Sequence, residues 1–242
     1  MAICIGTAGW SIPRETAASF PSEGTSLERY AARFPVAEIN SSFHRVHRPS
    51  TWERWRDSVP SDFRFSVKLP KQITHQCKLR DCEEALVGFL SHAELLLEKL
   101  AVLLVQLPPS HVFDAAVATA FFTALKARTT AAVVCEPRHI SWFDGEADAL
   151  LAQLRVGRVA ADPALCSLAG RPGGWAGIRY WRLHGSPTIY RSSYRDRIPL
   201  FAAEFARDAS AGAPVWCIFD NTASAAAAGD AMALSEAVRD FA

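Results

Sequence analysis

Residues 131–139 read Ala-Ala-Val-Val-Cys-Glu-Pro-Arg-His, an apolar run that ends abruptly in charged side chains. The same pattern recurs where residues 63–67 end at Lys68 and where residues 178–181 run into Arg182-Leu183-His184. Parallel strands that are buried on both faces appear in a sequence as nearly unbroken apolar runs. Polar side chains repeated at one end of such strands indicate a ligand site at the carboxyl edge of a parallel sheet.

Eight apolar runs of this kind alternate with stretches that have helical spacing. The strands are expected at residues 3–8, 36–42, 63–68, 101–106, 131–136, 156–162, 177–184 and 214–219. The helices are expected near residues 27–34, 50–57, 82–100, 114–126, 144–155 and 198–209, followed by an alanine-rich helix at the end.

This alternation predicts an α/β fold, a TIM-type (β/α)8 barrel that residues 1–242 form as a single domain. The Gly- and Pro-rich residues 163–176 stand where the sixth helix would be, so we expect the barrel to be irregular around its sixth unit. A doubly wound open sheet is the main alternative. It is disfavoured because no Gly-x-Gly-x-x-Gly turn follows the first strand.

Composition limits the classes of partner. The formal net charge of +1 gives no overall field that would attract nucleic acid or an anionic membrane. The six cysteines are scattered without a close Cys-x-x-Cys pair, so we expect free thiols. No basic stretch precedes an apolar segment at the start, and no apolar stretch is long enough to span a bilayer. We therefore expect a cytoplasmic protein without membrane contact, and the sequence leaves its oligomeric state open.

Polar side chains two residues apart on one strand share a face of the sheet. The apolar residues between them, such as Ile39, Cys135 and Leu183, would pack against helices, so the polar set should point into the barrel. Ionised groups buried there carry a large desolvation penalty unless they are paired. We therefore expect ion pairs, a ligand site or both. The pairs that share a face are Glu38 with Asn40, Glu136 with Arg138, and Arg182 with His184.

The residue types suggest roles. Glu136 or Asp162 is the candidate general base, and His184 or His75 is the candidate acid, because histidine titrates near neutral pH. Lysine and arginine would hold a phosphate or carboxylate group. The candidate ligand-binding residues are Trp10, Asn40, Lys68, Gln106, Arg138, Trp142, Arg182, Tyr190 and Asn221.

Each of these interpretations has a structural alternative. The charged residues that share the inner face could instead form an internal salt-bridge network that fixes strand register. Trp10 and Trp142 could plug the end of the barrel rather than stack on a ligand. Residues 190–195, Tyr-Arg-Ser-Ser-Tyr-Arg, form either an anion clamp with aromatic support or a solvated loop.

Seven short motifs in order resemble the YecE-like family, a TIM-barrel family defined as a domain of unknown function. This resemblance implies the barrel fold over essentially the whole chain, and no particular reaction. The chain differs from the usual family pattern at His44, Pro137 and Asp220 and near residues 19–21, all at the expected mouth. The matching motifs are residues 5–10 (Ile-Gly-Thr-Ala-Gly-Trp), 38–43 (Glu-Ile-Asn-Ser-Ser-Phe), 65–68 with 73–75, 106–109 (Gln-Leu-Pro-Pro), 136–142, 182–185 and 221–222.

Three functions remain in competition. The first is an enzyme that acts on a small or nucleotide-like anionic substrate at the carboxyl-terminal mouth of the barrel, with no built-in metal or cofactor. The second is a metal-dependent phosphoesterase or endonuclease-like enzyme, with nucleic acid as its substrate. Its candidate ligands are Glu136, Asp162, His139, His184 and Asp220, but no His-x-His or His-Glu-x-x-His spacing supports them. The third is a non-catalytic barrel that binds an anionic metabolite.

Overall fold

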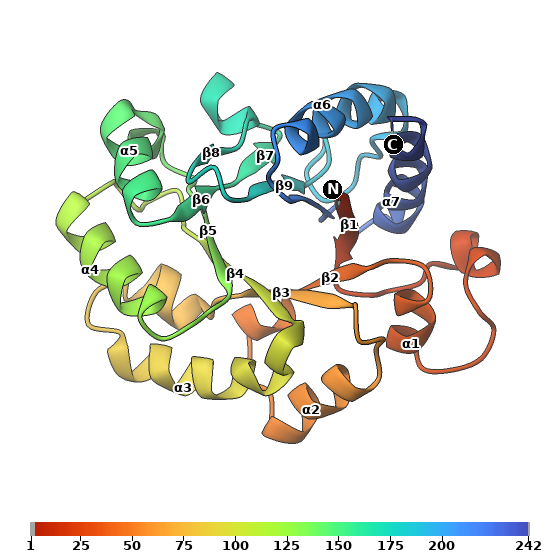
Figure 1. The fold of residues 1–242 in the computed structure, drawn as a ribbon, viewed down its shortest axis with the longest axis horizontal. Coiled ribbons are helices and arrows are strands. Elements are labelled where there is room, and N and C mark those ends of the chain that lie inside the picture. The colour runs from red at the N-terminus through yellow and green to blue at the C-terminus, as the bar shows by residue number, and fades with distance from the viewer. Residues whose placement is uncertain (1–2, 242) are drawn as a thin grey trace.

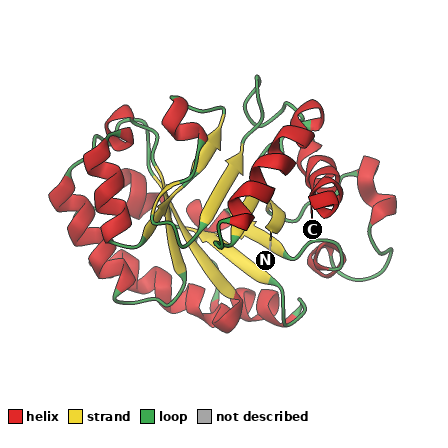
Figure 2. Cartoon of the chain, turned by 45° about the horizontal axis from the view of Figure 1, so that its top comes forward, coloured by secondary structure: helices red, strands yellow, loops and turns green. Residues whose placement is uncertain are grey.

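The predicted strands form one ring of parallel sheet, and the predicted helices surround it. The computed structural model describes residues 3–241. In Figure 1 the helices follow one another around the strands in chain order, and Figure 2 shows the strands gathered at the centre with the helices outside them. The predicted TIM-type barrel is confirmed.

The elements alternate as expected. The strands are β1 Ile3–Ala8, β2 Val36–Ile39, β3 Arg64–Lys68, β4 Leu100–Gln106, β5 Ala132–Glu136, β6 Val156–Arg158, β7 Ala160–Asp162, β8 Gly173–Gly174, β9 Arg179–Leu183 and β10 Val215–Phe219. The helices are α1 Ser26–Ala31, α2 Pro49–Asp57, α3 Glu83–Ala93, α4 Ala115–Lys126, α5 Gly145–Gln153, α6 Ile198–Ser210 and α7 Ala226–Ala237.

The sixth strand closes the ring, and it does so in two halves. β6 pairs with β5 and β7 pairs with β9, with only Val159 between the halves. The backbone N–H of Val159 donates to the carbonyl oxygen of Cys135 at 2.8 Å, and that of His184 donates to Asp162 at 2.8 Å. Between β7 and β9 the described chain forms a short helical turn and the two-residue β8 in place of an α-helix. The predicted irregularity of the sixth unit is therefore confirmed.

Two predicted elements are too long. The second strand ends at Ile39 instead of residue 42, because the Ser42 hydroxyl bonds the carbonyl oxygens of Ile39 and Lys68 and bends the chain into a helical turn. The helix predicted to reach residue 100 ends at Ala93, since Leu97 adopts φ 53° in the segment that follows.

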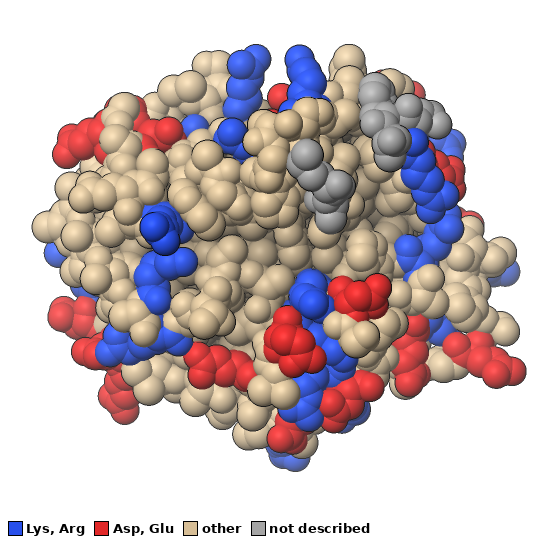
Figure 3. All heavy atoms as spheres, in the orientation of Figure 1, with Lys and Arg blue, Asp and Glu red and all other residues tan. Residues whose placement is uncertain are grey.

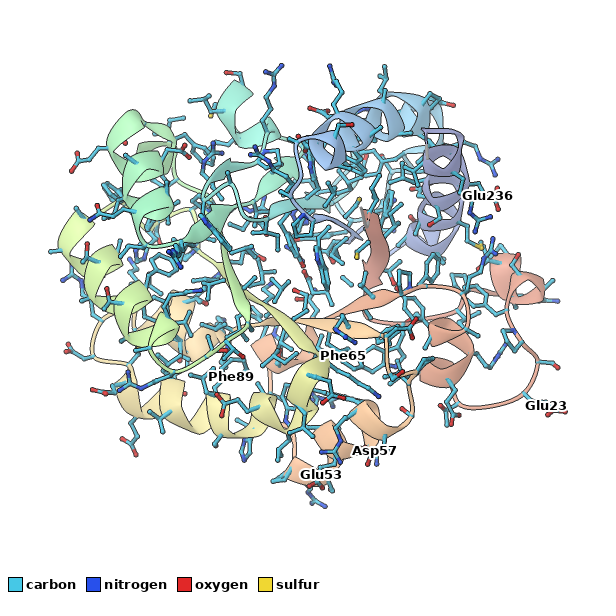
Figure 4. The ribbon with its side chains drawn as sticks, in the orientation of Figure 1. Glu23, Glu53, Asp57, Phe65, Phe89 and Glu236 are labelled. Carbon is cyan, nitrogen blue, oxygen red and sulfur yellow. The ribbon has the colours of Figure 1, made fainter. Side chains whose placement is uncertain are left out.

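Apolar side chains fill both sides of the sheet. Inside the ring, residues such as Val102, Leu104 and Trp216 form a compact cluster that occupies the lower part of the barrel. Outside it, a larger cluster joins the sheet to the helices, and Figure 4 shows Phe65 and Phe89 toward the interior, whereas Glu23, Glu53, Asp57 and Glu236 lie at the periphery. A filled barrel leaves only its upper end for polar side chains.

The outer surface carries both signs of charge. Basic and acidic side chains are interspersed over the face seen in Figure 3, where neither sign forms a continuous patch. None of the helices described between residues 3 and 241 combines the length and apolar character needed to cross a bilayer.

Gly6 provides a test of how closely β1 and β2 approach. A Cβ at this position would overlap the backbone carbonyl of Val36 and lie 3.0 Å from the Tyr30 hydroxyl oxygen. We predict that Gly6→Ala lowers the free energy of unfolding by about 2 kcal/mol, as overpacking does. The measurement is urea unfolding followed by circular dichroism.

The matched control is Gly229→Ala in α7, where the nearest atom to the added Cβ is Thr16 Cγ2 at 3.8 Å. This variant should keep or raise stability, because alanine favours a helix interior by about 1 kcal/mol over glycine. Equal unfolding midpoints for the two variants would contradict the close approach at Gly6.

Candidate functional site

One arginine organises the polar end of the barrel. Arg182, on β9, is 0% exposed and points inward. Its Nε and Nη2 atoms donate to the two carboxylate oxygens of Glu38 at 3.0 and 2.6 Å. Nη1 donates to Glu136 at 2.7 Å and to Gln106 at 3.2 Å, and Nη2 also donates to Asp220 at 3.0 Å. A guanidinium has five N–H groups, so every donor of Arg182 already has a protein acceptor.

This arrangement changes the interpretation of Arg182. The sequence suggested that Arg182 binds a ligand directly, but no donor remains free for one. Arg182 and its partner Glu38, also 0% exposed, instead match the structural alternative of an internal salt-bridge network. Gln106 likewise uses its side-chain oxygen on Arg182. Through these atoms, Arg182 and Gln106 therefore position the site rather than contact a ligand.

The network keeps its members charged. Burial alone would raise the pKa of Glu136, but Arg138, Arg182 and His184 outweigh burial and hold that pKa well below its usual value. Burial also opposes the charge of Asp220, whose pKa is nevertheless lowered, chiefly by Arg182 and His184. Burial would lower the pKa of Arg182, yet its carboxylate neighbours raise it well above the ordinary value. Each charge therefore depends on the others.

His184 lies between two carboxylates. Its Nδ1 is 3.0 Å from Asp220 Oδ2, and its Nε2 is 2.9 Å from Glu136 Oε1. Arg138, which pairs with Glu136, brings Nη2 to 2.7 Å from the same Nε2. A neutral ring with its proton on Nδ1 accepts from Arg138, whereas a protonated ring donates to both carboxylates. Nε2 of His184 is thus the ring nitrogen that faces both Glu136 and Arg138.

Three polar groups near this network form no hydrogen bond or ion pair within the described part of the chain. Lys68, on β3, is 7% exposed, and no carboxylate among the described side chains lies within ion-pair distance of its Nζ. The ammonium instead lies 4.1 Å from the centre of the Phe43 ring. Asn40 Oδ1 and Arg138 Nε are buried without a hydrogen-bond partner in the described chain. Ile39 of β2 pairs with Val67 of β3. The residues that follow them, Asn40 and Lys68, therefore lie at the same level along the barrel.

The pKa of Lys68 is lowered to about 8. Burial is the largest cause and Arg182 adds to it, while Glu38, Glu136 and Asp220 oppose it. Lys68 is thus mostly charged at neutral pH, but it loses its proton far more easily than an exposed lysine does.

His75 lies beside this group rather than within the ionic network. Its ring packs edge-on against Phe43 with 4.9 Å between ring centres, and Nδ1 lies 2.9 Å from the Thr74 hydroxyl oxygen. Burial and the nearby Lys68 and Lys71 lower its pKa, so His75 is neutral at pH 7.

The structure corrects the placement of Asp162. Leu183, its partner across β7 and β9, packs toward the helices, and the Asp162 side chain points the same way. Its carboxylate accepts from the Tyr194 hydroxyl at 2.8 Å and from two nitrogens of Arg197 at 2.9 and 2.7 Å. Asp162 therefore belongs to an outer ion pair, and the suggested role as general base is not supported.

The two tryptophans also have structural positions. Trp142 is 0% exposed and its indole N–H donates to the carbonyl oxygen of His111 at 2.9 Å. Trp10 packs against Trp55 of α2 and Phe65 of β3, with ring centres 5.2 and 6.3 Å apart. The contacts described for both tryptophans are therefore with packing partners rather than with members of the ionic network.

The last two predicted ligand-binding residues differ from each other. Asn221 is 0% exposed and its amide donates to Ser192 and Asp230, so it ties the loop after β9 to α7. Tyr190 is 45% exposed and its ring lies edge-on to His184 with 6.0 Å between ring centres. Tyr190 thus covers His184 at the mouth, in the left-handed backbone region at φ 65°.

The five metal-site candidates do not form one group, because only Glu136, His184 and Asp220 contact one another. Asp162 points outward, and His139 accepts from the backbone N–H of Ser141 at the start of a helical turn. Within residues 3–241, no group of three His, Cys, Asp or Glu side chains is placed to hold a metal ion. The geometry of these residues therefore does not favour the metal-dependent alternative.

Tyr180 and Ser66 also belong to this cluster, although neither was predicted from the sequence. The Tyr180 hydroxyl lies 3.1 Å from Glu38 Oε2 and 2.7 Å from Ser66 Oγ, beneath the network. Both residues stand two positions before a predicted site residue, Arg182 or Lys68, so the two-residue period could have found them.

Known proteins identify the family. Residues 4–241 match the family described as "Protein of unknown function DUF72", and the chain belongs to this family. It is 35% identical over 106 residues to the UPF0759 protein YecE of Escherichia coli K12, a match that covers 44% of this chain and 38% of YecE. It is 31% identical over 80 residues to the UPF0759 protein YunF of Bacillus subtilis, covering 31% of this chain and 27% of YunF. The chain thus spans well under half of these curated relatives, and the predicted YecE-like resemblance is confirmed.

Solved structures agree on the fold. A DUF72 family protein from Enterococcus faecalis superposes with a TM-score of 0.82 at 18% identity, over 98% of this chain and 96% of that one. A DUF72 family protein from Thermotoga maritima gives a TM-score of 0.75 at 20% identity, over 99% and 100%.

Removing Arg182 tests whether the network depends on it. We predict that Arg182→Met lowers the free energy of unfolding at pH 7 by about 3–5 kcal/mol, because buried carboxylates lose their counter-charge. The lowered pKa values of Glu136 and Asp220 stabilise the wild type above the unfolded-state pKa, and this gain is lost as the pH falls through the folded-state pKa. The deficit of the variant should therefore shrink when urea unfolding is repeated near pH 4.

The matched control is Arg33→Met, which removes a surface ion pair with Glu236. An exposed pair of this kind contributes at most about 1 kcal/mol. A similar loss in both variants, or a deficit of Arg182→Met that does not change with pH, would contradict the central role of Arg182.

Proposed function

We propose that this member of the DUF72 family is an enzyme that binds a small hydroxylated anion at the carboxyl-terminal mouth of the barrel and moves a proton through His184. The proposal rests on a contrast between two kinds of polar group in one cluster, those that are fully hydrogen-bonded and those that are not. Arg182 has no free donor, whereas among the described residues Arg138 Nε and Asn40 Oδ1 are buried without a partner and Lys68 forms no ion pair. Buried polar groups are normally hydrogen-bonded, so unpartnered ones at a barrel mouth indicate a missing ligand.

The unpartnered groups specify the chemistry of the ligand. Lys68 and Arg138 Nε offer donors and positive charge, which suit the oxygens of a phosphate or carboxylate group. Asn40 Oδ1 is an acceptor and calls for a donor such as a hydroxyl group. A small anion that also carries a hydroxyl group satisfies all three.

The proton step rests on His184. Asp220 holds Nδ1, so the proton that changes place is the one at Nε2, next to Glu136 and Arg138. Because its pKa is strongly lowered, Glu136 stays ionised and is better suited to stabilise a protonated His184 than to act as the base itself. We therefore assign His184 as the group that takes and returns the proton.

Tyr190 controls access in this proposal. His184 is only 1% exposed beneath the Tyr190 ring, so a substrate reaches Nε2 when the loop carrying Tyr190 moves. A non-glycine residue at φ 65° is strained, and such strain is typical of functional loops.

A non-catalytic binding barrel is the second candidate, and the burial of His184 and Glu136 favours it. The same anion would then bind to Lys68 and Arg138 without chemical change. The two readings share a binding site and differ only in whether the bound anion is converted.

Lys68 gives a test of binding. Using glycerol 3-phosphate as the probe and glycerol as its uncharged comparison, we expect saturable binding of the phosphate by calorimetry. Lys68→Met should weaken it at least tenfold, since a buried charge-assisted hydrogen bond contributes about 1.5–3 kcal/mol. In the wild type, affinity should fall as the pH rises through about 8, where Lys68 loses its charge. The phosphate group stays dianionic over this range, because its second pKa is about 6.

The exposed Lys71→Met is the matched control and should bind as the wild type does. Equal affinities for Lys68→Met and the wild type would remove Lys68 from the site.

His184 gives a test of catalysis. In a screen of small hydroxylated phosphates and carboxylates, His184→Gln should reduce turnover by about 10²–10⁴-fold, the usual contribution of general acid–base catalysis. It should still bind glycerol 3-phosphate. The control His139→Gln lies outside the network and should keep its turnover. An anion that binds and is recovered unchanged from the wild type would favour the non-catalytic barrel.

A further inference from the structure

A hollow lies outside the barrel mouth. It has a volume of about 240 Å³ and is separate from the ionic network, between the chain that follows β2, the turn after β3 and one face of α3. Its wall is mostly apolar and aromatic. It includes Ser42, Arg45, Val46, His47, Trp52, Pro70, Gln72, Ala85, Gly88, Phe89 and His92.

The amino-acid sequence of α3 leaves its side of the hollow open. Ala85, Gly88, Phe89 and His92 are spaced so that they share one face of the helix. A Cβ built on Gly88 would meet no atom within 4 Å. Glycine weakens a helix interior relative to alanine, and no close contact here requires it. Gly88 thus leaves empty the space that a side chain would otherwise fill.

The opposite wall carries an unsatisfied donor. Trp52, on α2, is 2% exposed, and its Nε1 is buried without an acceptor in the described chain. A buried N–H without a partner costs free energy. An oxygen of a bound molecule would supply the acceptor.

The rim supplies positive charge and apolar surface. Arg45 is exposed and forms no ion pair among the described side chains, and Val46 is 80% exposed beside it. Burial, with Arg45 nearby, lowers the pKa of His47, so the charge at this rim at neutral pH belongs to Arg45. An anionic group is the natural partner of this rim.

We propose that this hollow binds a small aromatic carboxylate with a second oxygen on its ring. The ring lies against Phe89 and Trp52 over Gly88, the carboxylate pairs with Arg45, and the ring oxygen accepts from the Trp52 N–H. A cavity of about 150 Å³ holds benzene, so the observed volume suits one ring with two small substituents. A neighbouring groove shares Arg45 and Val46 with this hollow.

The test uses calorimetry on the full chain with 4-hydroxybenzoate as the probe. We expect saturable binding with a Kd of about 1 mM or tighter, in keeping with a ligand of this size. Gly88→Phe should abolish it by filling the hollow, whereas the matched Gly88→Ala should bind as the wild type does. Ala85→Leu fills the hollow from one turn away and serves if Gly88→Phe does not fold.

Charge and location are tested separately. Arg45→Met should weaken 4-hydroxybenzoate about two- to fivefold, as the loss of an exposed ion pair would, and leave the neutral 4-hydroxybenzamide unchanged. Benzoate, which lacks the ring oxygen, should bind more weakly than 4-hydroxybenzoate. Lys68→Met should bind the probe normally, which separates this site from the barrel mouth.

Three results would overturn the inference. They are no saturable binding by the wild type, equal binding by the folded Gly88→Phe and Gly88→Ala variants, or loss of binding in Lys68→Met. The first two would show that the hollow takes no such ligand, and the third would place the probe at the mouth.

Discussion

A single buried guanidinium sets the geometry of the barrel's polar end. Arg182 connects β9 to side chains from β2, β4 and β5 and to Asp220 just after β10, so five strands share one set of hydrogen bonds. Buried charges are tolerated only when they are paired. Glu38, Glu136 and Asp220 all pair with Arg182, and Arg138 adds a second cation beside Glu136. Because every N–H group of Arg182 already has an acceptor, Lys68 and Arg138 are the cations that remain able to bind a ligand.

Much of this arrangement could be predicted from the sequence. Strand positions and the inward face of Glu38, Glu136, Arg182 and His184 follow from apolar runs and the two-residue period. The role predicted for Asp162 is not supported, for a specific reason. It was placed by its position at a strand end, whereas the inward residue of that strand is Ala161, which pairs with Arg182.

Other features depend on three-dimensional partners that no sequence period encodes. Arg182 and Lys68 have the same sequence context, yet one is saturated and the other unpartnered, because only the fold determines how many acceptors each cation meets. The placement of loop residues is harder still to predict from the sequence, since a loop has no regular face. Trp142 and Tyr190 both follow strands, but Trp142 is buried in packing and Tyr190 lies open over His184.

The sixth strand of the barrel is divided into β6 and β7, and we call their junction at Val159 the seam of the ring. Among the described strands β6 pairs with β5 and with the two-residue β8, whereas β7 pairs with β9, so no single strand bridges β5 and β9 along its whole length. His184 and the Tyr190 loop adjoin this seam through the backbone contact with Asp162. The His184 backbone is therefore held by the strand that completes the ring, so any change at this closure acts directly on the position of His184.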